Sequence, residues 1–130
     1  MAFFSWSDQM SVGNMQMDTQ HKRLFDLINQ LYDAMKAGKG KEVAGKIVSE
    51  LHKYTVTHFR DEEKMLAGIN YPKLNEQKSS HKKFTDKVAQ FQKDLEGGKM
   101  TVNVEMMSFL KDWLVNHIQK MDKEYSQVQV

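Results

Sequence analysis

Residues 51–68 read LHKYTVTHFRDEEKMLAG, and this stretch decides the fold. Its apolar positions recur every three or four residues, the spacing of an amphipathic helix rather than of a strand; they are Leu51, Tyr54, Thr55, Phe59, Met65 and Leu66. His58 lies in register with this stripe, and Glu62 follows it four residues later, about 40° further around a helix. One buried helix face therefore carries an imidazole and a carboxylate that can approach the same centre.

The same helical periodicity extends along most of the chain. It predicts helices over residues 18–37, 41–67, 72–96 and 104–123, joined by short loops. Asp18 is a good N-cap for the first helix, and Pro72 suits the first turn of the third. No segment has the strict alternation of a half-buried strand. The chain is therefore expected to be all-α, an up-down-up-down four-helix bundle.

Residues 1–17 precede the first expected helix and are rich in apolar side chains. An arm with so much apolar surface should pack across the bundle rather than face water; its apolar residues are Phe3, Phe4, Trp6, Val12, Met15 and Met17. With 130 residues, the chain is the size of one domain. We therefore expect a single domain over residues 1–130.

Composition excludes several classes of function. A formal net charge of +2, from 19 basic and 17 acidic side chains, is too near neutral to favour nucleic acid. The absence of cysteine excludes disulfides, thiolate zinc sites, iron–sulfur clusters and covalently attached c-type haem, so a metal would need nitrogen and oxygen donors. The first residues do not resemble a signal peptide, and no apolar run could insert into a membrane. We expect a cytoplasmic protein.

Each of the four expected helices carries one histidine on its apolar face. These are His21, His58, His81 and His117, whereas His52 lies about 120° around from His58 and is expected at the surface. Asp122 follows His117 by five residues. This looser match to one helix face works if the helix frays or the side chain swings near its C-terminal end.

Four imidazoles and two carboxylates are thus expected near the bundle axis. A single histidine on an apolar helix face is more often a hydrogen-bonded core residue than a metal ligand. Four histidines in phase on four helices are a much stronger indication. Buried carboxylates and imidazoles are costly unless they pair or bind cations, so this arrangement favours a metal site.

The pattern resembles that of the haemerythrin family, and especially its bacterial members. The matching motifs are Asp18-x-x-His21, His58-x-x-x-Glu62 and Trp113-Leu114-x-x-His117-x-x-x-x-Asp122. The resemblance extends from Trp6 to the last helix. It implies a four-helix bundle around a non-haem di-iron centre that binds O2 reversibly.

The resemblance also implies roles for individual residues. His21 and His58 would hold the iron with an open position for O2, and His81 and His117 would hold the other iron. Glu62 and Asp122 would bridge the two irons beside an oxo or hydroxo group. An apolar lining would keep water from the O2 pocket; it would consist of Leu24, Phe59, Trp113, Leu114 and Ile118.

Gln77 is the departure from the family pattern, which has a histidine at this position, four residues before His81. An amide oxygen is a hard, neutral donor that suits iron less well than imidazole. Gln77 could ligate weakly, hydrogen-bond a water at the vacant position, or leave the second iron site partly empty. All three outcomes predict a more labile centre and faster autoxidation, and Gln77→His should raise iron retention.

Three functions remain open at this stage. The first is O2 binding for storage, delivery or sensing without catalysed turnover, apart from weak peroxidase or oxidase-like side activity. The second is a di-iron or mono-iron redox enzyme that acts on peroxide or nitric oxide, and the third is an iron-handling bundle. No protein partner is indicated, and we expect a monomer or weak homo-oligomer. The paired Glu-x-x-His motifs of ferritin-like oxidases are absent.

Overall fold

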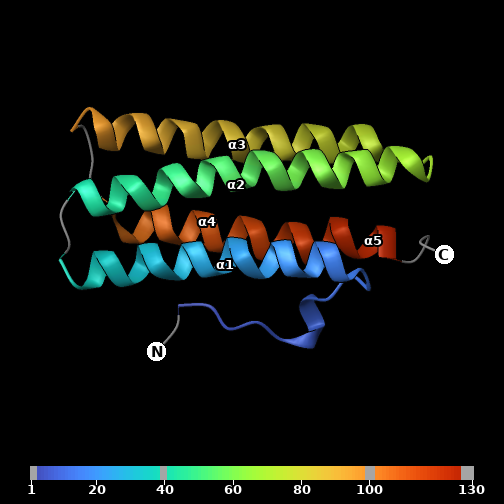
Figure 1. The fold of residues 1–130 in the computed structure, drawn as a ribbon, viewed down its shortest axis with the longest axis horizontal. Helices are drawn as coiled ribbons and strands as arrows, with labels where there is room; N and C mark the ends of the chain where they lie inside the picture. The colour runs from blue at the N-terminus through green and yellow to red at the C-terminus, as the bar shows by residue number, and fades with distance from the viewer. Residues whose placement is uncertain (1–2, 39–40, 99–101, 127–130) are drawn as a thin grey trace.

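A computed structural model of the chain describes residues 3–38, 41–98 and 102–126. Four long helical rods lie side by side and alternate in direction (Figure 1). The first three rods are α1 (Met15–Lys36), α2 (Lys41–Gly68) and α3 (Leu74–Glu96). The fourth is α4 (Val104–Asn116), continued by the π-helix η2 (His117–Asp122) and by α5 (Lys123–Ser126). No strand occurs in these ranges, and the expected all-α four-helix bundle is confirmed.

The first helix begins earlier than the expected residue 18. The N-cap of α1 is Asn14, whose side-chain oxygen accepts a hydrogen bond from the Met17 amide. Asp18 lies inside the first turn, where it accepts hydrogen bonds from the Ser11 hydroxyl at 2.5 Å and the Val12 amide at 2.9 Å. The expectation that Asp18 is the N-cap is therefore wrong, because this carboxylate ties the preceding segment to the helix.

The N-terminal segment runs along α1 and contains the short 3-10 helix η1 (Asp8–Met10) (Figure 1). Phe4 stacks on Phe25 with ring centroids 3.9 Å apart, and its backbone exchanges two hydrogen bonds with the Asn29 side chain. Val12 is buried as expected. Met15, by contrast, is 85% exposed, so the expectation that it packs on the bundle is wrong.

The third helix begins two residues later than expected. Pro72 and Lys73 lie in a turn rather than in the first turn of α3. Asn70 just before them has a φ of 55°, a left-handed conformation that asparagine tolerates better than most residues. The reversal at residues 69–73 thus completes the chain's change of direction before α3 starts.

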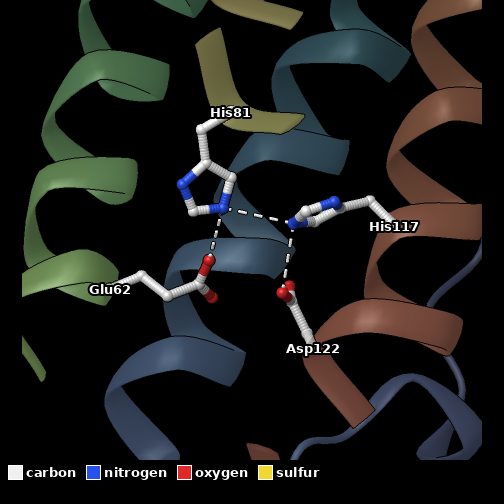
Figure 2. Close-up of side chains that lie close together, drawn as sticks. All are labelled: Glu62, His81, His117 and Asp122. Atoms are coloured by element: carbon white, nitrogen blue, oxygen red, sulfur yellow. Dashed lines mark hydrogen bonds and ion pairs between the residues drawn. The ribbon is translucent and has the colours of Figure 1, made fainter. Parts of the chain in front are cut away.

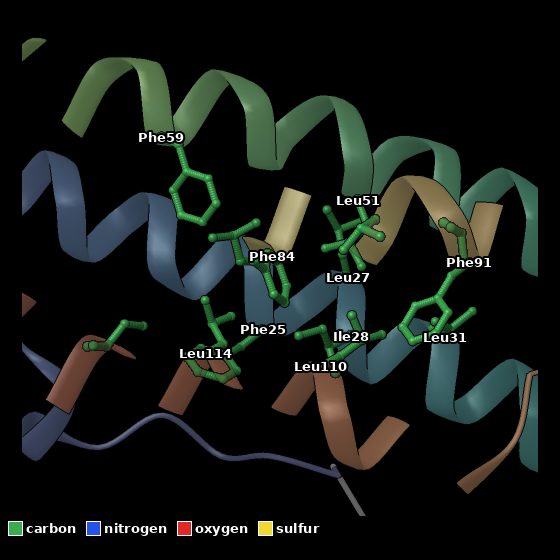
Figure 3. Packing of buried hydrophobic residues seen from close by; sticks show 14 of the residues in the cluster. Phe25, Leu27, Ile28, Leu31, Leu51, Phe59, Phe84, Phe91, Leu110 and Leu114 are labelled. Atoms are coloured by element: carbon green, nitrogen blue, oxygen red, sulfur yellow. The ribbon is translucent and has the colours of Figure 1, made fainter. Parts of the chain in front are cut away.

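The apolar core fills most of the space between the four rods (Figure 3). Leu31, Leu51, Phe91 and Leu110 pack together at the side away from Phe59. The buried polar groups instead come from residues near the start of α1, in the second half of α2, near the start of α3 and in η2. None of the described helices combines the length and apolarity needed to cross a membrane. The core therefore consists of an apolar part and a polar part that holds the site.

Candidate metal centre

Four imidazoles and two carboxylates meet inside the bundle, one imidazole from each rod. All six side chains are buried; they are His21 on α1, His58 and Glu62 on α2, His81 on α3, and His117 and Asp122 in η2. The structure thus brings together every residue that the sequence proposed as a metal ligand.

Glu62 lies between two pairs of histidines. Its Oε1 is 2.9 Å from His81 Nε2, and its Oε2 is 3.5 Å from His21 Nε2 and 3.7 Å from His58 Nε2. One carboxylate oxygen therefore faces His81, and the other faces the pair formed by His21 and His58.

Asp122 spans the same gap from the opposite rod. Its Oδ1 is 3.1 Å from His117 Nε2, and its Oδ2 is 3.2 Å from His21 Nε2. Figure 2 shows Glu62 and Asp122 converging on His81 and His117, whose Nε2 atoms are 3.2 Å apart. Each carboxylate therefore directs one oxygen to each histidine pair, which is the arrangement that two bridged cations require.

The π-helix η2 explains the spacing between His117 and Asp122. An α-helix has 3.6 residues per turn, so residues five apart diverge by about 140°. The π-helical turn follows an i→i+5 pattern and places both side chains on one face. The expectation of a frayed helix end or a swung Asp122 side chain is therefore wrong. Instead, each turn of the backbone contains about one more residue here than in an α-helix.

Three of the four rings are oriented by a partner on the neighbouring rod. His58 Nδ1 lies 2.6 Å from Gln20 Oε1, and His81 Nδ1 lies 2.8 Å from Glu63 Oε2. Each partner directly precedes or follows a ligand candidate in the sequence. Such contacts fix the tautomer and orientation of a ligating imidazole.

The third of these contacts joins His117 Nδ1 to the Ser80 hydroxyl at 3.0 Å. The Tyr125 hydroxyl also donates to Glu62 Oε2 at 2.8 Å. The sequence analysis missed Gln20, Glu63, Ser80 and Tyr125. In the sequence, these residues stand out only because each lies next to, or one helical turn from, a candidate ligand. That position does not show which rod the side chain contacts.

Gln77 is fully inside the site. Its Nε2 donates a hydrogen bond to Asp122 Oδ1 at 3.0 Å, and the side chain is 1% exposed. Its Oε1 finds no hydrogen-bond donor among the residues that the structure describes. The residue thus contacts the carboxylate of Asp122 through nitrogen.

Aromatic rings cover one side of the site. Phe59 stacks on His81 with centroids 3.8 Å apart, and Trp113 stacks on His117 at 4.6 Å. Leu24, Leu114 and Ile118 are buried. Of the side chains expected to line an O2 pocket, four therefore lie in the core, and Trp113 is partly buried against it. Their role in O2 binding stays a prediction.

Burial and charge determine the protonation of the metal-free site. Burial opposes protonation of His21, but the close contacts and negative charges of Asp122 and Glu62 outweigh it and raise the pKa of His21 to about 9. Burial is likewise outweighed by carboxylate contacts at His81, whose pKa is raised to about 8. At His58 burial prevails and lowers the pKa to about 4. Without metal, His21 and His81 therefore carry protons at neutral pH.

Both carboxylates stay ionised despite complete burial. Burial would raise the pKa of Glu62, but close contacts with His21 and His81 hold this pKa well below its ordinary value. Burial and the charge of Glu62 oppose ionisation of Asp122, yet contacts with His117 and His21 lower the pKa of Asp122 as well. The site thus keeps two buried negative charges that attract cations.

The donor set fits two iron ions. Glu62 Oε1, Asp122 Oδ2 and His21 Nε2 are fully buried and have no aligned hydrogen bond within the described residues. One donor atom each from Glu62, His81, His117 and Asp122 lies within 4.8 Å of the others, as does one each from His21, His58 and Glu62. Imidazole and carboxylate are donors that iron accepts. Metal ions would satisfy groups that are otherwise costly to bury.

Comparisons with known proteins agree with this geometry. Residues 13–128 match the family described as "Hemerythrin HHE cation binding domain". The chain is 36% identical to "Bacteriohemerythrin" of Methylococcus capsulatus, covering 96% of this chain and 95% of that protein. It is 34% identical to "Hemerythrin-like protein" of Naegleria gruberi, covering 96% and 92%.

Solved structures point the same way. A crystal structure of wild-type hemerythrin superposes with a TM-score of 0.91 at 34% identity, covering 97% of each chain. The crystal structure of a hemerythrin L114Y mutant superposes with a TM-score of 0.92, covering 98% of this chain and 97% of that one. Together with the family match and the two bridged histidine pairs, these likenesses show that the chain belongs to the haemerythrin family, whose domain implies a non-haem di-iron centre.

Proposed function

We propose that this protein binds O2 reversibly at a non-haem di-iron centre. The observation that carries the proposal is the placement of two buried carboxylates, each spanning the gap between two pairs of imidazole Nε2 atoms. Membership of the haemerythrin family supports it. In this proposal His21 and His58 hold one iron, His81 and His117 hold the other, and Glu62 and Asp122 bridge them.

The residues of the chain prepare the site for this chemistry. When bound, the two irons supply the electrons that O2 accepts and returns on release. Glu62 and Asp122 offset the positive charge of the metals, and the ring partners of His58, His81 and His117 keep each Nε2 directed inward. The stacked rings of Phe59 and Trp113 exclude water, which would otherwise promote irreversible oxidation.

Iron content and O2 uptake measured on the same sample test the proposal. We expect about two irons per chain, one O2 taken up per iron pair after anaerobic reduction, and recovery of the starting absorption spectrum when O2 is removed. Steady consumption of O2 or peroxide with a reductant would instead support a redox enzyme. Less than one iron in freshly reconstituted protein would contradict a di-iron function.

Two histidines on α2 provide a matched pair of variants. His58→Ala removes a proposed ligand, whereas His52→Ala removes a partly exposed imidazole outside the site. We expect His58→Ala to lose O2 binding and iron, and His52→Ala to keep both. Equal behaviour of the two variants would contradict the assignment of His58.

Several finer points stay predictions. Storage, delivery and sensing would use the same site and differ in the partner or in O2 affinity. The cytoplasmic location and the monomeric or weakly oligomeric state expected from the sequence can be tested by cell fractionation and analytical ultracentrifugation.

A further inference from the structure

Each bridging carboxylate is held by one neutral donor from the protein. The Tyr125 hydroxyl donates to Glu62 Oε2 at 2.8 Å, and the Gln77 amide nitrogen donates to Asp122 Oδ1 at 3.0 Å. Tyr125, Glu62, Gln77 and Asp122 are all buried. Gln77 thus does for Asp122 what Tyr125 does for Glu62: it donates one hydrogen bond to the carboxylate.

The hydrogen bond fixes which end of the amide faces Asp122. An amide nitrogen donates hydrogen bonds and has no lone pair available for a metal, whereas the amide oxygen only accepts. Reversing the Gln77 amide would place its oxygen against the ionised Oδ1 of Asp122 and replace an attraction by a repulsion. Asp122 Oδ1 is also the oxygen closest to His117. Gln77 therefore steadies the oxygen that faces the second histidine pair.

This arrangement makes the two donor sets alike. His21 and His58 share Glu62 and Asp122 with His81 and His117, and neither pair has a third imidazole. An imidazole at position 77 would add one donor to the second set only. With Gln77 bonded to Asp122 through nitrogen, that additional donor is missing.

We propose that Gln77 is a positioning residue that anchors Asp122 and leaves an exchangeable coordination position at the metal held by His81 and His117. The ligand for this position is water or a small anion. A protic ligand can donate a hydrogen bond to the buried Gln77 Oε1, which has no donor among the residues that the structure describes. The inference rests on the proposed di-metal function. It adds a second small-ligand site to the one expected beside His21 and His58.

Azide counting on Co²⁺-loaded protein tests the proposal without O2 or redox chemistry. Wild type, Gln77→His and Gln77→Leu are loaded with excess Co²⁺, their metal content is measured, and azide is titrated while its infrared stretch and the cobalt absorption are followed. We expect two Co²⁺ per chain in all three. Wild type and Gln77→Leu should bind one more azide per metal pair than Gln77→His.

The other azide counts overturn the inference. Equal counts for wild type and Gln77→His mean that no additional position is open. One more azide on Gln77→Leu than on wild type means that the Gln77 oxygen itself ligates the metal, and this comparison remains available if Gln77→His does not fold. If Gln77→His binds two Co²⁺ and wild type binds only one, then wild type does not bind the metal beside His81 and His117.

Metal counts separate this inference from the proposed function. Fewer than two Co²⁺ in both wild type and Gln77→His overturns the di-metal proposal together with the inference. Two Co²⁺ with equal azide counts overturns only the inference.

The anchoring role has a readout of its own. Gln77→Leu removes the hydrogen bond to Asp122, so the affinity for the second Co²⁺ should fall by roughly 10- to 100-fold, as when other outer partners of metal ligands are lost. In Zn²⁺-loaded wild type, the Gln77 side-chain amide protons should exchange slowly with solvent in nuclear magnetic resonance spectra. Fast exchange, or unchanged affinity in Gln77→Leu, would show that Gln77 does not anchor Asp122.

Discussion

The two halves of the centre orient their imidazoles in different ways. In the half formed by His81 and His117, both Nδ1 atoms have partners, the carboxylate of Glu63 at 2.8 Å and the hydroxyl of Ser80 at 3.0 Å. In the other half, His58 has such a partner, and His21 has none within the described residues. The half formed by His81 and His117, where the family pattern has a further histidine in place of Gln77, therefore has more hydrogen-bond partners behind its imidazoles.

The partners follow the order of the rods. Gln20 on α1 contacts His58 on α2, Glu63 on α2 contacts His81 on α3, and Ser80 on α3 contacts His117 in η2. The series stops at His21, whose buried Nδ1 has no partner within residues 3–38, 41–98 and 102–126. His21 is instead held from inside, by Glu62 and Asp122, and this contact raises its pKa to about 9.

The two halves of the centre therefore have different weaknesses. The half formed by His81 and His117 depends on its outer hydrogen bonds, because both of its rings are oriented through Nδ1 by a side chain of the protein. The half formed by His21 and His58 depends on the bridging carboxylates, and a proton on His21 competes with the metal. Substitution of a bridging carboxylate, protonation of His21 and substitution of an outer hydrogen-bond partner should therefore change the metal affinities of the two halves by different amounts.

Glu62→Gln should have the largest effect, because Glu62 serves both halves. A neutral amide would replace the carboxylate that faces both histidine pairs, so metal affinity should fall by more than the ~100-fold loss typical of an outer partner. Equilibrium dialysis with Co²⁺ should then show less than one metal per chain. Glu63→Gln, one residue away, is the matched control and should weaken only the half that contains His81. Similar losses in both variants would contradict the shared role of Glu62.

Metal uptake should release protons and strengthen as pH rises. His21 and His81 have pKa values of about 9 and 8 without metal, and a ligating imidazole must be neutral. Affinity should therefore increase roughly 10-fold per pH unit for each proton displaced. Calorimetric titration of metal-free protein at pH 7, in buffers with different heats of protonation, measures the protons released. Heats that do not depend on the buffer would contradict the raised pKa values.

The metal-free fold should respond to pH in the opposite direction. The folded pKa of His21 lies above its ordinary value of 6.5, so the stabilisation from protonated His21 is complete below pH 6.5 and is lost as pH rises through about 9. His81 adds a loss in the same direction around pH 8. Thermal unfolding should therefore give a lower Tm at pH 9.5 than at pH 7. A Tm that rises over this range would contradict the assignment.

Outer partners should have moderate effects that are confined to one half. Ser80→Ala removes the contact to His117, and Gln20→Leu removes the contact to His58. Each should lower affinity for one metal by about 10-fold, the lower end for such partners. Stepwise Co²⁺ titration separates the two binding events. Loss of both metals in either variant would indicate a folding defect, which circular dichroism of the metal-free protein would detect.

Much of this site follows from helical periodicity in the sequence. His21, His58, His81 and His117 fall in phase with apolar residues, and the structure buries all four. Glu62 follows from its i+4 spacing. Burial of such groups is predictable because a helix face that is apolar on both sides of a residue also removes that residue from water.

Contacts between rods do not follow from periodicity. The His117–Asp122 spacing left a fraying helix or a swung side chain as explanations, whereas the backbone forms a π-helix there. Asp18 was expected to cap α1, but it accepts hydrogen bonds from Ser11 and Val12 instead. Neither feature can be read from the periodicity of a single helix, which contains no information on the contacts that its residues make with other segments.

The smallest effect is expected at the outer end of the Gln20 contact. Gln20 Nε2 donates to Asp61 Oδ2 at 2.9 Å, so Asp61 orients the amide that in turn orients His58. Asp61 is only partly buried, and the net value of such a bond is near the lower limit of about 0.5 kcal/mol. Asp61→Asn should therefore weaken the metal beside His58 by roughly twofold and leave the other metal unchanged. If Asp61→Asn lowers the Co²⁺ affinity as much as Gln20→Leu does, the charge of Asp61, and not the Gln20 oxygen, orients His58. The two halves of the centre would then differ in the charge near their histidines and not in the geometry of their hydrogen bonds.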